Sequence, residues 1–457
     1  MGVEEVIWES NLREKFEQIV QACIPNEFQA QARNIIIASC ENNARERNSR
    51  IVQEQDMVRG LFKATPPIFF SEIERKLKQM NIDIHKYKET TWEGLEETWK
   101  SGTQSITWGI TTECNLRCPY CSNDSSEKSP DEMEAEGIKL ILDKLAKHFE
   151  IQQQKASICW IGGEPLLRKD IYEIIHYSHE QGISNALSTN GTLITIEIAR
   201  KLKESGLDII FVSLDSHIKQ IHDTLRPYSY DKAIAAIEIC KRIGLTVVVS
   251  ATITKLNIDN LEEFKDFCES KLGVLFYFYQ FVGVGRGNKL YDRLALTQEQ
   301  YRKMYELKNK EIIGMIRQGL LEQLPLMSLF DLVPFMESPK DEREKKYLLE
   351  AGVGCQACRR MFAINHRGEM LACGRLGYYD FPLGDLKKQS PEEIMSSEIF
   401  NDFRNRIKRK GKCAKCKYLP LCGGGCLAET YIQTKDPFEE YPFCWYNPAT
   451  ILDRENV

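Results

Sequence analysis

Three cysteines stand close together at Cys114, Cys118 and Cys121, in a C-x3-C-x2-C arrangement that directly follows the strand-like run 105–110. Thiolates are the usual protein ligands of iron–sulfur clusters, and a cubane cluster needs four ligands. A loop with only three thiolates therefore leaves one iron open to a ligand that is not protein. Structural zinc sites are closed by four ligands, and no fourth Cys or His lies nearby in the sequence. This spacing indicates a cluster with a reactive iron, with a zinc knuckle or a chance grouping as alternatives.

A second group of cysteines occupies the last hundred or so residues, in the order C-x2-C, G-x4-C, C-x2-C-x5-C-x3-C and a final single cysteine. Eight thiolates suffice for two fully ligated cubanes, although C-x2-C pairs also suit zinc ribbons. A fully ligated cluster has no open iron, which indicates a role in electron transfer or structure. The eight are Cys355, Cys358, Cys373, Cys413, Cys416, Cys422, Cys426 and Cys444.

Composition places the chain among ordinary globular proteins of two or three domains, since its 457 residues are 42% hydrophobic and 28% charged. A formal net charge of -5 gives no electrostatic reason to expect nucleic acid or an anionic membrane as a partner. The acidic start lacks the features of a signal peptide, and no apolar run is long enough to span a bilayer. We therefore expect a cytoplasmic protein, whose 16 cysteines serve metal binding more than disulfides.

The elements that must position the first three cysteines lie between about residues 104 and 310. Short apolar strands alternate there with amphipathic helices, the pattern of an α/β fold with parallel strands. Function in such folds collects on the loops after the carboxyl ends of the strands. The expected strands are 105–110, 158–161, 185–188, 209–214, 246–252 and 275–281, and the expected helices are 169–181, 195–205, 230–243 and 261–272.

Several of these loops carry polar or glycine-rich motifs. The turn 162–165, Gly-Gly-Glu-Pro, follows the second strand, where glycines let the backbone approach a ligand and Glu164 can accept from an ammonium group. The same motif could be a plain strand-to-helix turn. Arg226, which stands near the helix after the fourth strand, is a further candidate for the site, with a solvent-exposed arginine as the alternative. The segment 283–287, Gly-Val-Gly-Arg-Gly, lacks the third glycine of a dinucleotide fingerprint. We expect it to be a loop at the barrel mouth, near substrate or cofactor.

The remaining segments read as helical or structural. Residues 1–95 are expected to form a helical domain, broken at Pro66-Pro67, and residues 311–350 a charged helical bridge. The other cysteines are expected in the core, the first two because they lack partners at metal-ligand spacing and the last three because they lie within strand or helix patterns. They are Cys23, Cys40, Cys159, Cys240 and Cys268. Histidines have no evident metal partner and are expected to be surface or structural residues, namely His176, His179, His217 and His222, with His366 unassigned.

The three-cysteine loop after the first strand of a β/α series resembles the radical S-adenosylmethionine superfamily. The resemblance implies a partial (β/α)6 TIM-type barrel at 100–310, and an open iron chelated by the amino and carboxylate groups of S-adenosyl-L-methionine. One electron, from a flavodoxin- or ferredoxin-type donor, then gives methionine and a 5′-deoxyadenosyl radical that abstracts hydrogen. Cys114, Cys118 and Cys121 would be the catalytic ligands. The implied cofactor contacts are Gly162, Gly163, Glu164, Pro165, Ser188, Asn190, Ser213, Asp215 and Arg226.

The eight later cysteines resemble the SPASM extension of radical enzymes, expected at 351–457 as a small iron–sulfur domain. The resemblance implies two auxiliary clusters, for a total of three [4Fe–4S] clusters. It assigns one auxiliary cluster to Cys355, Cys358, Cys373 and Cys426, and the other to Cys413, Cys416, Cys422 and Cys444.

The substrate is less sharply indicated. Segments 118–123 and 163–168 resemble the enzyme of pyrroloquinoline quinone synthesis, which joins two side chains of a precursor peptide. Segments 381–386 and 411–426 resemble enzymes that trim haem-precursor side chains. The helical segment around residues 8–58 is similar to a small module of protochlorophyllide-reductase-type proteins, a hint of tetrapyrroles. Sulfatase-maturing relatives carry an acidic residue where this chain has Gly374, which disfavours that activity.

The leading hypothesis is a radical oxidoreductase or maturase that cross-links or oxidises a peptide or protein. The first alternative is radical modification of a tetrapyrrole side chain. The second is a non-catalytic iron–sulfur electron carrier, against which the turn 162–165 speaks, because a carrier needs no pocket for S-adenosylmethionine.

Overall fold

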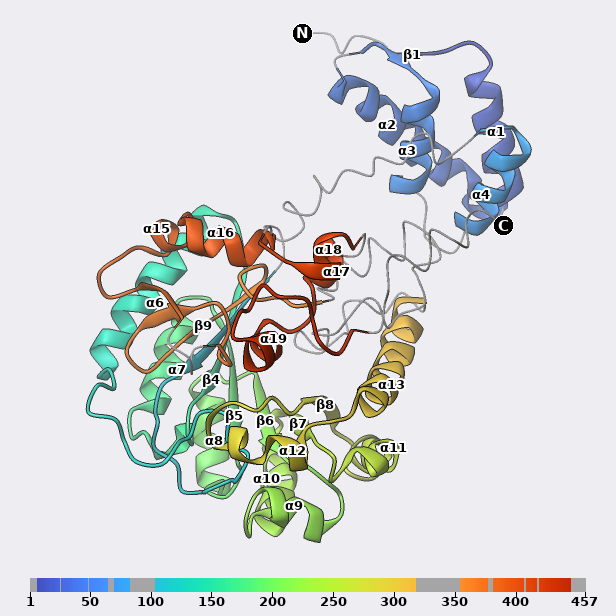
Figure 1. Ribbon diagram of the computed structural model, residues 1–457. Coiled ribbons are helices and arrows are strands. Elements are labelled where there is room, and N and C mark those ends of the chain that lie inside the picture. The colour runs from blue at the N-terminus through green and yellow to red at the C-terminus, as the bar shows by residue number, and fades with distance from the viewer. Residues whose placement is uncertain are drawn as a thin grey trace. The chain divides into compact units, whose positions relative to one another are not determined.

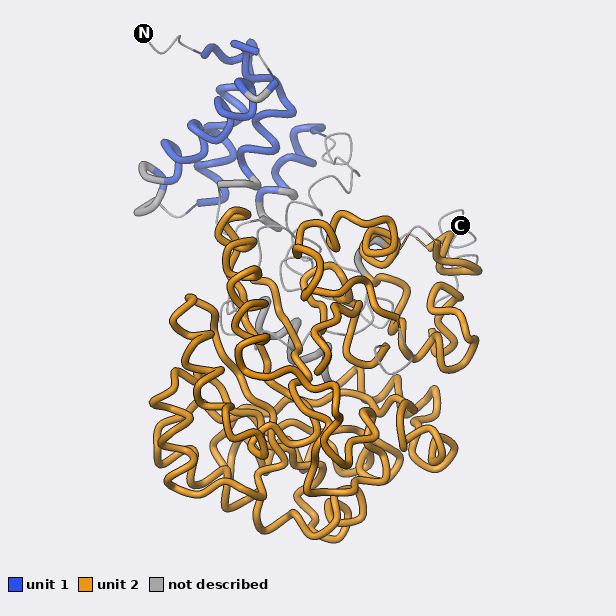
Figure 2. The backbone as a smooth tube through the Cα atoms, turned by 90° about the vertical axis from the view of Figure 1, so that its left-hand side faces the viewer, with its two compact units in different colours: residues 1–92 blue, residues 93–457 orange. Residues whose placement is uncertain are grey.

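The structure is a computed structural model (Figure 1). It describes residues 6–24, 26–47, 49–64, 70–82, 103–317, 354–376, 381–406, 408–416 and 419–444. The chain divides into two compact units, residues 1–92 and 93–457 (Figure 2). The proline pair expected to break the first domain, and all of the expected bridge beyond residue 317, lie outside the described residues.

The N-terminal unit is helical, as its sequence predicts. It contains α1 (Leu12–Cys23), α2 (Asn26–Glu46), α3 (Glu54–Ala64) and α4 (Phe70–Gln79), with a short parallel pair, β1 (Ile7–Trp8) and β2 (Ile51–Val52), that was not predicted. Cys23 and Cys40 belong to its apolar core, which confirms the structural role expected for both. Gly60 explains why Cys40 fits there, because a Cβ at Gly60 would lie 2.3 Å from Cys40 Sγ. Glycine thus lets α3 pack closely on α2.

All six strands predicted for the core are present, and neighbouring strands pair in parallel. They are β3 (Gln104–Gly109), β4 (Ala156–Ile161), β5 (Ser184–Thr189), β6 (Ile209–Ser213), β7 (Thr246–Ile253) and β8 (Leu275–Gln280). Their side chains alternate between two apolar layers. Trp108 and Trp160 pack in the large core shared with the helices, whereas Cys159 and Phe211 belong to a separate cluster on the opposite face. Strands apolar on both faces are what a covered parallel sheet requires.

Helices cover the outer face of these strands (Figure 1). The predicted ones appear as α7 (Ile171–Glu180), α8 (Ile196–Glu204), α10 (Tyr230–Ile243) and α11 (Leu261–Asp266), the last continued by a π-helical turn, Phe267–Lys271. Three others were not predicted: α6 (Ala135–Ile151), α9 (Lys219–Leu225) and α12 (Tyr291–Leu294). Helix α13 (Gln298–Arg317) was not predicted before residue 311, and its residues 311–317 are helical as expected for the start of the bridge. Cys240 and Cys268 lie in the core between helices and sheet, as expected. No described helix is long and apolar enough to cross a membrane.

The cysteine-rich C-terminal region continues the same sheet, which the sequence did not predict. The strand β9 (Met361–Ile364) pairs in parallel with β3, from Ser105 opposite Met361 to Trp108 opposite Ile364. Beyond it follow β10 (Glu369–Leu371) and β11 (Pro382–Asp385), both antiparallel. The sheet order is therefore β11-β10-β9-β3-β4-β5-β6-β7-β8. Short helices complete the region: α15 (Pro391–Met395), α16 (Glu398–Asn405), α17 (Gly411–Ala414), α18 (Leu419–Cys422) and α19 (Leu427–Thr434).

The six parallel strands curve into a partial barrel. The loop after β8 touches the loop after β3, although these strands are five positions apart in the sheet. A Cβ at Gly285, after β8, would lie 2.5 Å from the carbonyl oxygen of Cys121, after β3. Gly285 also has φ 60°, a conformation that favours glycine. Curvature therefore gathers the loops that follow the strands around one opening.

Candidate functional site

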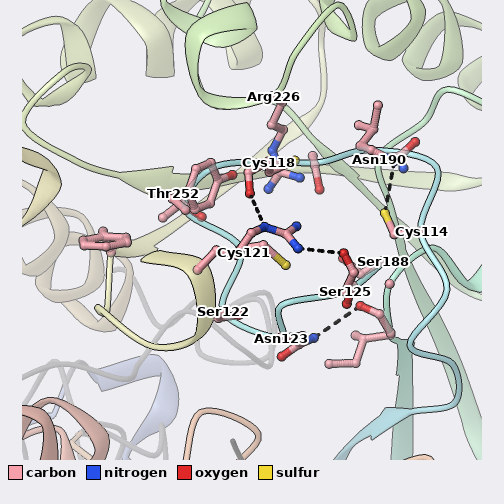
Figure 3. A pocket seen from close by; sticks show the side chains of 18 of the residues that line it. Cys114, Cys118, Cys121, Ser122, Asn123, Ser125, Ser188, Asn190, Arg226 and Thr252 are labelled. Atoms are coloured by element: carbon pink, nitrogen blue, oxygen red, sulfur yellow. Dashed lines mark hydrogen bonds between the residues drawn. The ribbon is translucent and has the colours of Figure 1, made fainter. Parts of the chain in front are cut away.

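The three cysteines of the first motif line one pocket of about 210 Å³ (Figure 3). Six of the nine predicted cofactor contacts line the same pocket, namely Gly162, Gly163, Ser188, Asn190, Ser213 and Arg226. The remaining three, Glu164, Pro165 and Asp215, are buried behind it. Strand-end loops that are far apart in sequence thus converge, as expected for an α/β fold.

Arg286 holds the three-cysteine loop in place. Its backbone N–H donates to the carbonyl oxygen of Cys121 at 3.0 Å, and its Nε donates to that of Cys118 at 3.1 Å. Its Nη1 donates to the carbonyl oxygen of Ser125 and to Asp124 Oδ1, both at 2.9 Å. The expectation that segment 283–287 lies at the barrel mouth is confirmed. The specific role of Arg286 was missed, because carbonyl partners leave no trace in sequence.

The glycine pair of the turn 162–165 packs against the chain that leads into the cysteine loop. A Cβ at Gly162 would lie 2.5 Å from the carbonyl oxygen of Thr111, and one at Gly163 would lie 2.0 Å from that of Glu113. Backbone N–H groups of Gly163 and Glu164 donate to these two oxygens at 2.8 and 2.7 Å. The glycines are therefore needed to position Cys114 as well as to line the pocket.

Glu164 ties the glycine turn to the loop after β5. Its side chain is fully buried and accepts from Asn190 N–H and Thr189 Oγ1 at 2.8 Å each, and from Leu166 N–H at 3.2 Å. Burial raises the pKa of this carboxyl to about 7, against the hydrogen bonds that favour its charged form. Asn190 in turn donates to Asn115 Oδ1 at 2.8 Å, inside the cysteine motif. Glu164 thus positions residues of the pocket wall.

Asp215 holds two residues against the cysteine loop. Its Oδ2 accepts from Arg226 Nε at 2.7 Å and from Tyr120 Oη at 2.5 Å, while Oδ1 accepts from the N–H of Thr252 at 2.9 Å. Arg226 also lies 5.4 Å from the Tyr120 ring centroid. A solvent-exposed Arg226, the alternative left open by sequence, is wrong, because its side chain is only 14% exposed. Tyr120 was missed although it stands within the motif.

His222 supports Asp215 from the far side. Its Nδ1 accepts from the backbone N–H of Asp215 at 3.1 Å, and its Nε2 lies 2.9 Å from Ser229 Oγ. Since Ser229 Oγ donates to the Arg226 carbonyl oxygen at 2.8 Å, the imidazole proton resides on Nε2. Burial lowers the pKa of His222 to about 4. His222 is therefore a buried, neutral histidine with a structural role, as the sequence predicted.

Electrostatic effects associate the C-terminal cysteines in two groups, which adjoin each other because the backbone N–H of Cys355 donates to the Cys422 carbonyl oxygen at 3.1 Å. Burial, together with the neighbouring Cys355 and Cys373, raises the pKa of the Cys426 thiol to about 12, and the same two cysteines help to raise the pKa of Cys358. Burial likewise raises the pKa of Cys422 to about 12, with added effects of Cys444 and Cys413. The backbone N–H of Cys416 donates to the Cys413 carbonyl oxygen at 3.1 Å. We propose these two groups as the ligand sets of two clusters.

Buried arginines around these cysteines fit anionic clusters. Arg406 is fully buried. Its Nη2 donates to the Ala357 carbonyl oxygen at 2.9 Å and lies 3.5 Å from Cys355 Sγ. Its Nε and Nη1 have no hydrogen-bond partner. In the described part of the chain no carboxylate forms an ion pair with Arg406 or the buried Arg409. A buried cation needs a compensating charge, and thiolate-ligated iron–sulfur clusters supply negative charge. The donor set and its surroundings therefore suit such clusters.

In the described ranges, no three His, Cys, Asp or Glu side chains are spaced to hold a single metal ion. A cubane instead distributes its thiolates over separate irons. Cys114, Cys118 and Cys121 would hold the cluster with the open iron. Such a cluster, bound together with S-adenosylmethionine, supplies reductive cleavage of the sulfonium C–S bond.

Known protein families match three parts of the chain. Residues 108–270 match the radical SAM superfamily, and residues 355–417 match SPASM, an iron–sulfur cluster-binding domain. Residues 3–91 match DUF2621, a family described as a protein of unknown function. Both cysteine motifs thus lie in or next to matched regions.

Two relatives illustrate the range of similar proteins. The chain is 28% identical over 353 residues to an AdoMet-dependent heme synthase of Methanosarcina barkeri, a match that covers 75% of this chain and 97% of that protein. It is also 28% identical over 360 residues to the mycofactocin maturase MftC of Mycolicibacterium smegmatis, covering 77% and 85%. Similar proteins therefore include both a haem synthase and a maturase.

Solved structures share the fold. Streptococcus suis SuiB bound to the precursor peptide SuiA aligns with TM-score 0.57 at 17% identity, covering 83% of this chain and 88% of SuiB. Native anSMEcpe with bound AdoMet aligns with TM-score 0.56 at 20% identity, covering 74% and 93%. The matched families show that the chain contains a radical SAM domain followed by a SPASM domain, and these domains imply one S-adenosylmethionine-binding [4Fe–4S] cluster and auxiliary clusters.

Proposed function

We propose that this protein is a radical oxidoreductase that reductively cleaves S-adenosylmethionine and abstracts hydrogen from an organic substrate. One observation carries the proposal: the three-cysteine loop and six of the predicted cofactor contacts, which come from other loops, line a single pocket. Cys114, Cys118 and Cys121 bind the open cluster, and Ser188, Asn190 and Ser213 present polar groups to the cofactor.

Arg226 is one of three arginines in this pocket wall. Asp215 holds it and Tyr120 packs beside it, so its guanidinium is preorganised to face an anionic group. A flavodoxin- or ferredoxin-type protein supplies the electron, and the cluster chemistry suits a reducing, cytoplasmic compartment.

For the substrate we propose a tetrapyrrole side chain. The support is that the match to the M. barkeri heme synthase extends over 97% of that protein, and that similar relatives include an Fe-coproporphyrin III synthase and a pre-heme d1 synthase. This reverses the order favoured by the sequence motifs alone, in which a peptide came first.

A peptide or protein substrate is the second candidate, supported by the similarity to the mycofactocin maturase. In that case residues 1–92, which form a compact unit of their own, would bind a leader peptide. Tight binding of a porphyrin by the full-length protein, without binding of a precursor peptide, would decide against this candidate.

The test uses full-length protein reconstituted anaerobically with iron and sulfide, then reduced with dithionite and given S-adenosylmethionine. Wild type should hold about three cubanes' worth of iron and release 5′-deoxyadenosine. A variant with Cys114, Cys118 and Cys121 changed to alanine should keep its auxiliary iron and release none. The control, Cys240→Ala, alters a core cysteine outside the pocket and should retain activity.

Two results would contradict the proposal. Release of 5′-deoxyadenosine by the triple variant would show that another site carries the reaction. A fully loaded wild type that transfers electrons but never cleaves S-adenosylmethionine would favour the electron-carrier alternative. Folded protein that contains zinc and no iron would exclude both.

A further inference from the structure

Arg375 enters the pocket from the SPASM region. It follows Cys373 and Gly374, and Gly374 lies over the first strands of the sheet, since a Cβ there would be 3.9 Å from Ala363 Cβ on β9 and 4.0 Å from Thr107 Cγ2 on β3. The guanidinium of Arg375, however, lies 5.0 Å from the ring centroid of Tyr279 on β8. The side chain therefore spans the barrel interior between its first and last parallel strands.

Apart from the three cysteines that would hold the anionic cluster, the charged side chains that line the pocket are all basic. Three arginines line it, whereas no aspartate or glutamate does. Arg226 pairs with Asp215, and Arg286 pairs with Asp124 and binds carbonyl oxygens. For the Arg375 guanidinium, the described part of the chain provides the Tyr279 ring and no hydrogen bond or ion pair. A partly enclosed guanidinium of this kind is a ready donor for an incoming anion.

The chemistry of that anion follows from the shape of the donor. Guanidinium groups bind carboxylates through two parallel N–H bonds, and stacking on an aromatic ring holds the planar group in one orientation. Arg375 also lines the same pocket as the three catalytic cysteines. A carboxylate bound at Arg375 would keep the attached carbon chain in that pocket.

Three other partners for the Arg375 guanidinium must be distinguished from a substrate carboxylate. Cys373 and Cys426 are close enough to influence its charge, so it could serve an auxiliary cluster instead. Glu429 is a nearby acid, but its Oε1 accepts from Tyr291 Oη at 2.6 Å and no bond joins it to Arg375. A third possibility is the carboxylate of S-adenosylmethionine itself.

We propose that Arg375 binds a carboxylate of the substrate, and that the enzyme selects carboxylate-bearing substrates for this reason. The inference rests on the proposed function and deepens it. The propionate of a tetrapyrrole is the source that the proposed function favours, and a peptide carboxylate is the other source of the same chemistry.

The experiment compares wild type, Arg375→Gln and Arg375→Lys as cluster-loaded, full-length proteins. The probes are Fe-coproporphyrin III and its methyl ester, titrated by absorbance. Arg375→Gln should weaken binding of the acid by about 10- to 100-fold and leave the ester unchanged, because a charge-assisted hydrogen bond is lost. Arg375→Lys should lose less affinity for the acid, since lysine keeps the positive charge. Arg302→Gln, which removes an exposed arginine on α13, is the matched control and should bind like wild type.

A second pair of probes tests the other source, a short glutamate-containing peptide and its glutamine counterpart. If only the peptide binds in a way that depends on Arg375 and on its carboxylate, the proposal is supported and the source of the carboxylate is a peptide. The proposal is overturned if Arg375→Gln loses the same affinity for the acid as for the ester. It is also overturned if neither pair of probes shows a loss of affinity that depends on the carboxylate.

Two further readouts separate this inference from the proposed function. Without any probe, Arg375→Gln should bind S-adenosylmethionine with the affinity of wild type, and its auxiliary clusters should keep their electron paramagnetic resonance spectra. Loss of either would assign Arg375 to S-adenosylmethionine or to an auxiliary cluster and overturn the proposal. A wild type that binds the acid through Arg375 but never forms 5′-deoxyadenosine would refute the proposed function alone.

Discussion

Arg226 donates from Nε to the fully buried Asp215 Oδ2 at 2.7 Å, at the wall of the pocket that holds the three-cysteine loop. The same oxygen accepts from Tyr120 Oη, a residue of that loop. One carboxylate therefore fixes both a pocket cation and the cysteine motif.

Asp215→Asn should lower the free energy of unfolding by about 3–5 kcal/mol, because Arg226 is left as a buried charge without its partner. Arg226→Gln should destabilise as well, and the double variant should cost less than the sum of the two, as expected for residues in contact. Urea denaturation of the four proteins measures the coupling. Glu197→Gln, in an exposed pair with Lys201, should leave the free energy of unfolding close to that of wild type. Additive effects of Asp215 and Arg226 would refute the coupling.

His222 should make the protein less stable in mild acid. Its pKa is lowered from 6.5 to about 4 by burial, so between these values the unfolded chain binds a proton that the folded one does not. Stability is then fully present above about pH 6.5 and falls as the pH drops toward 4, by roughly 3 kcal/mol in total.

Denaturation at several pH values, compared with His222→Gln, checks this. The comparison is needed because Glu164, whose pKa is raised to about 7, contributes the opposite slope between its unfolded pKa of 4.5 and 7. Glutamine can still accept from Asp215 N–H and donate to Ser229, so it removes the titration and keeps the contacts. Identical pH slopes in the two proteins would contradict the assignment.

Gly163→Ala should damage the three-cysteine loop. Its Cβ would lie 2.0 Å from the Glu113 carbonyl oxygen, so the backbone before Cys114 must move, at a cost of about 1–3 kcal/mol. We expect lower iron incorporation at this cluster, with S-adenosylmethionine cleavage reduced in parallel. Gly109→Ala is the control, since its nearest atom would be the Ile364 carbonyl oxygen at 3.8 Å. Full iron loading of Gly163→Ala would show that the close approach is dispensable.

Arg406→Gln should shift the midpoint potential of one auxiliary cluster to more negative values. The change removes a buried cation next to Cys355 Sγ, and cluster potentials depend on nearby charge and on hydrogen bonds to sulfur. A redox titration followed by electron paramagnetic resonance measures it, and the signal of the S-adenosylmethionine-binding cluster should stay unchanged. Lys408→Gln removes a more exposed cation and should leave all potentials as in wild type. An unshifted potential in Arg406→Gln would argue against a cluster at Cys355.

Which parts of the fold and of the site can be predicted from the sequence depends on whether the interactions that form them are local in the chain. Strands β3 to β8 were predictable because their apolar runs are local, and the cysteine motifs because their spacing is local too. Helix α6 was missed although it is a long amphipathic helix, with buried positions from Ile138 to Phe149. No helix was predicted between the first two strands, although the amphipathic pattern there is a local signal of one.

The sequence alone determined the alternation of strands and helices, the open three-cysteine loop and the eight later cysteines. Only the tertiary structure decided that β9 pairs with β3, that Arg286 clamps the cysteine loop and that Arg375 reaches Tyr279. Local patterns record which face of an element is buried, whereas these contacts depend on how the sheet curves and which edge it leaves open. Curvature arises from the packing of the whole chain, so no short stretch of sequence can report it.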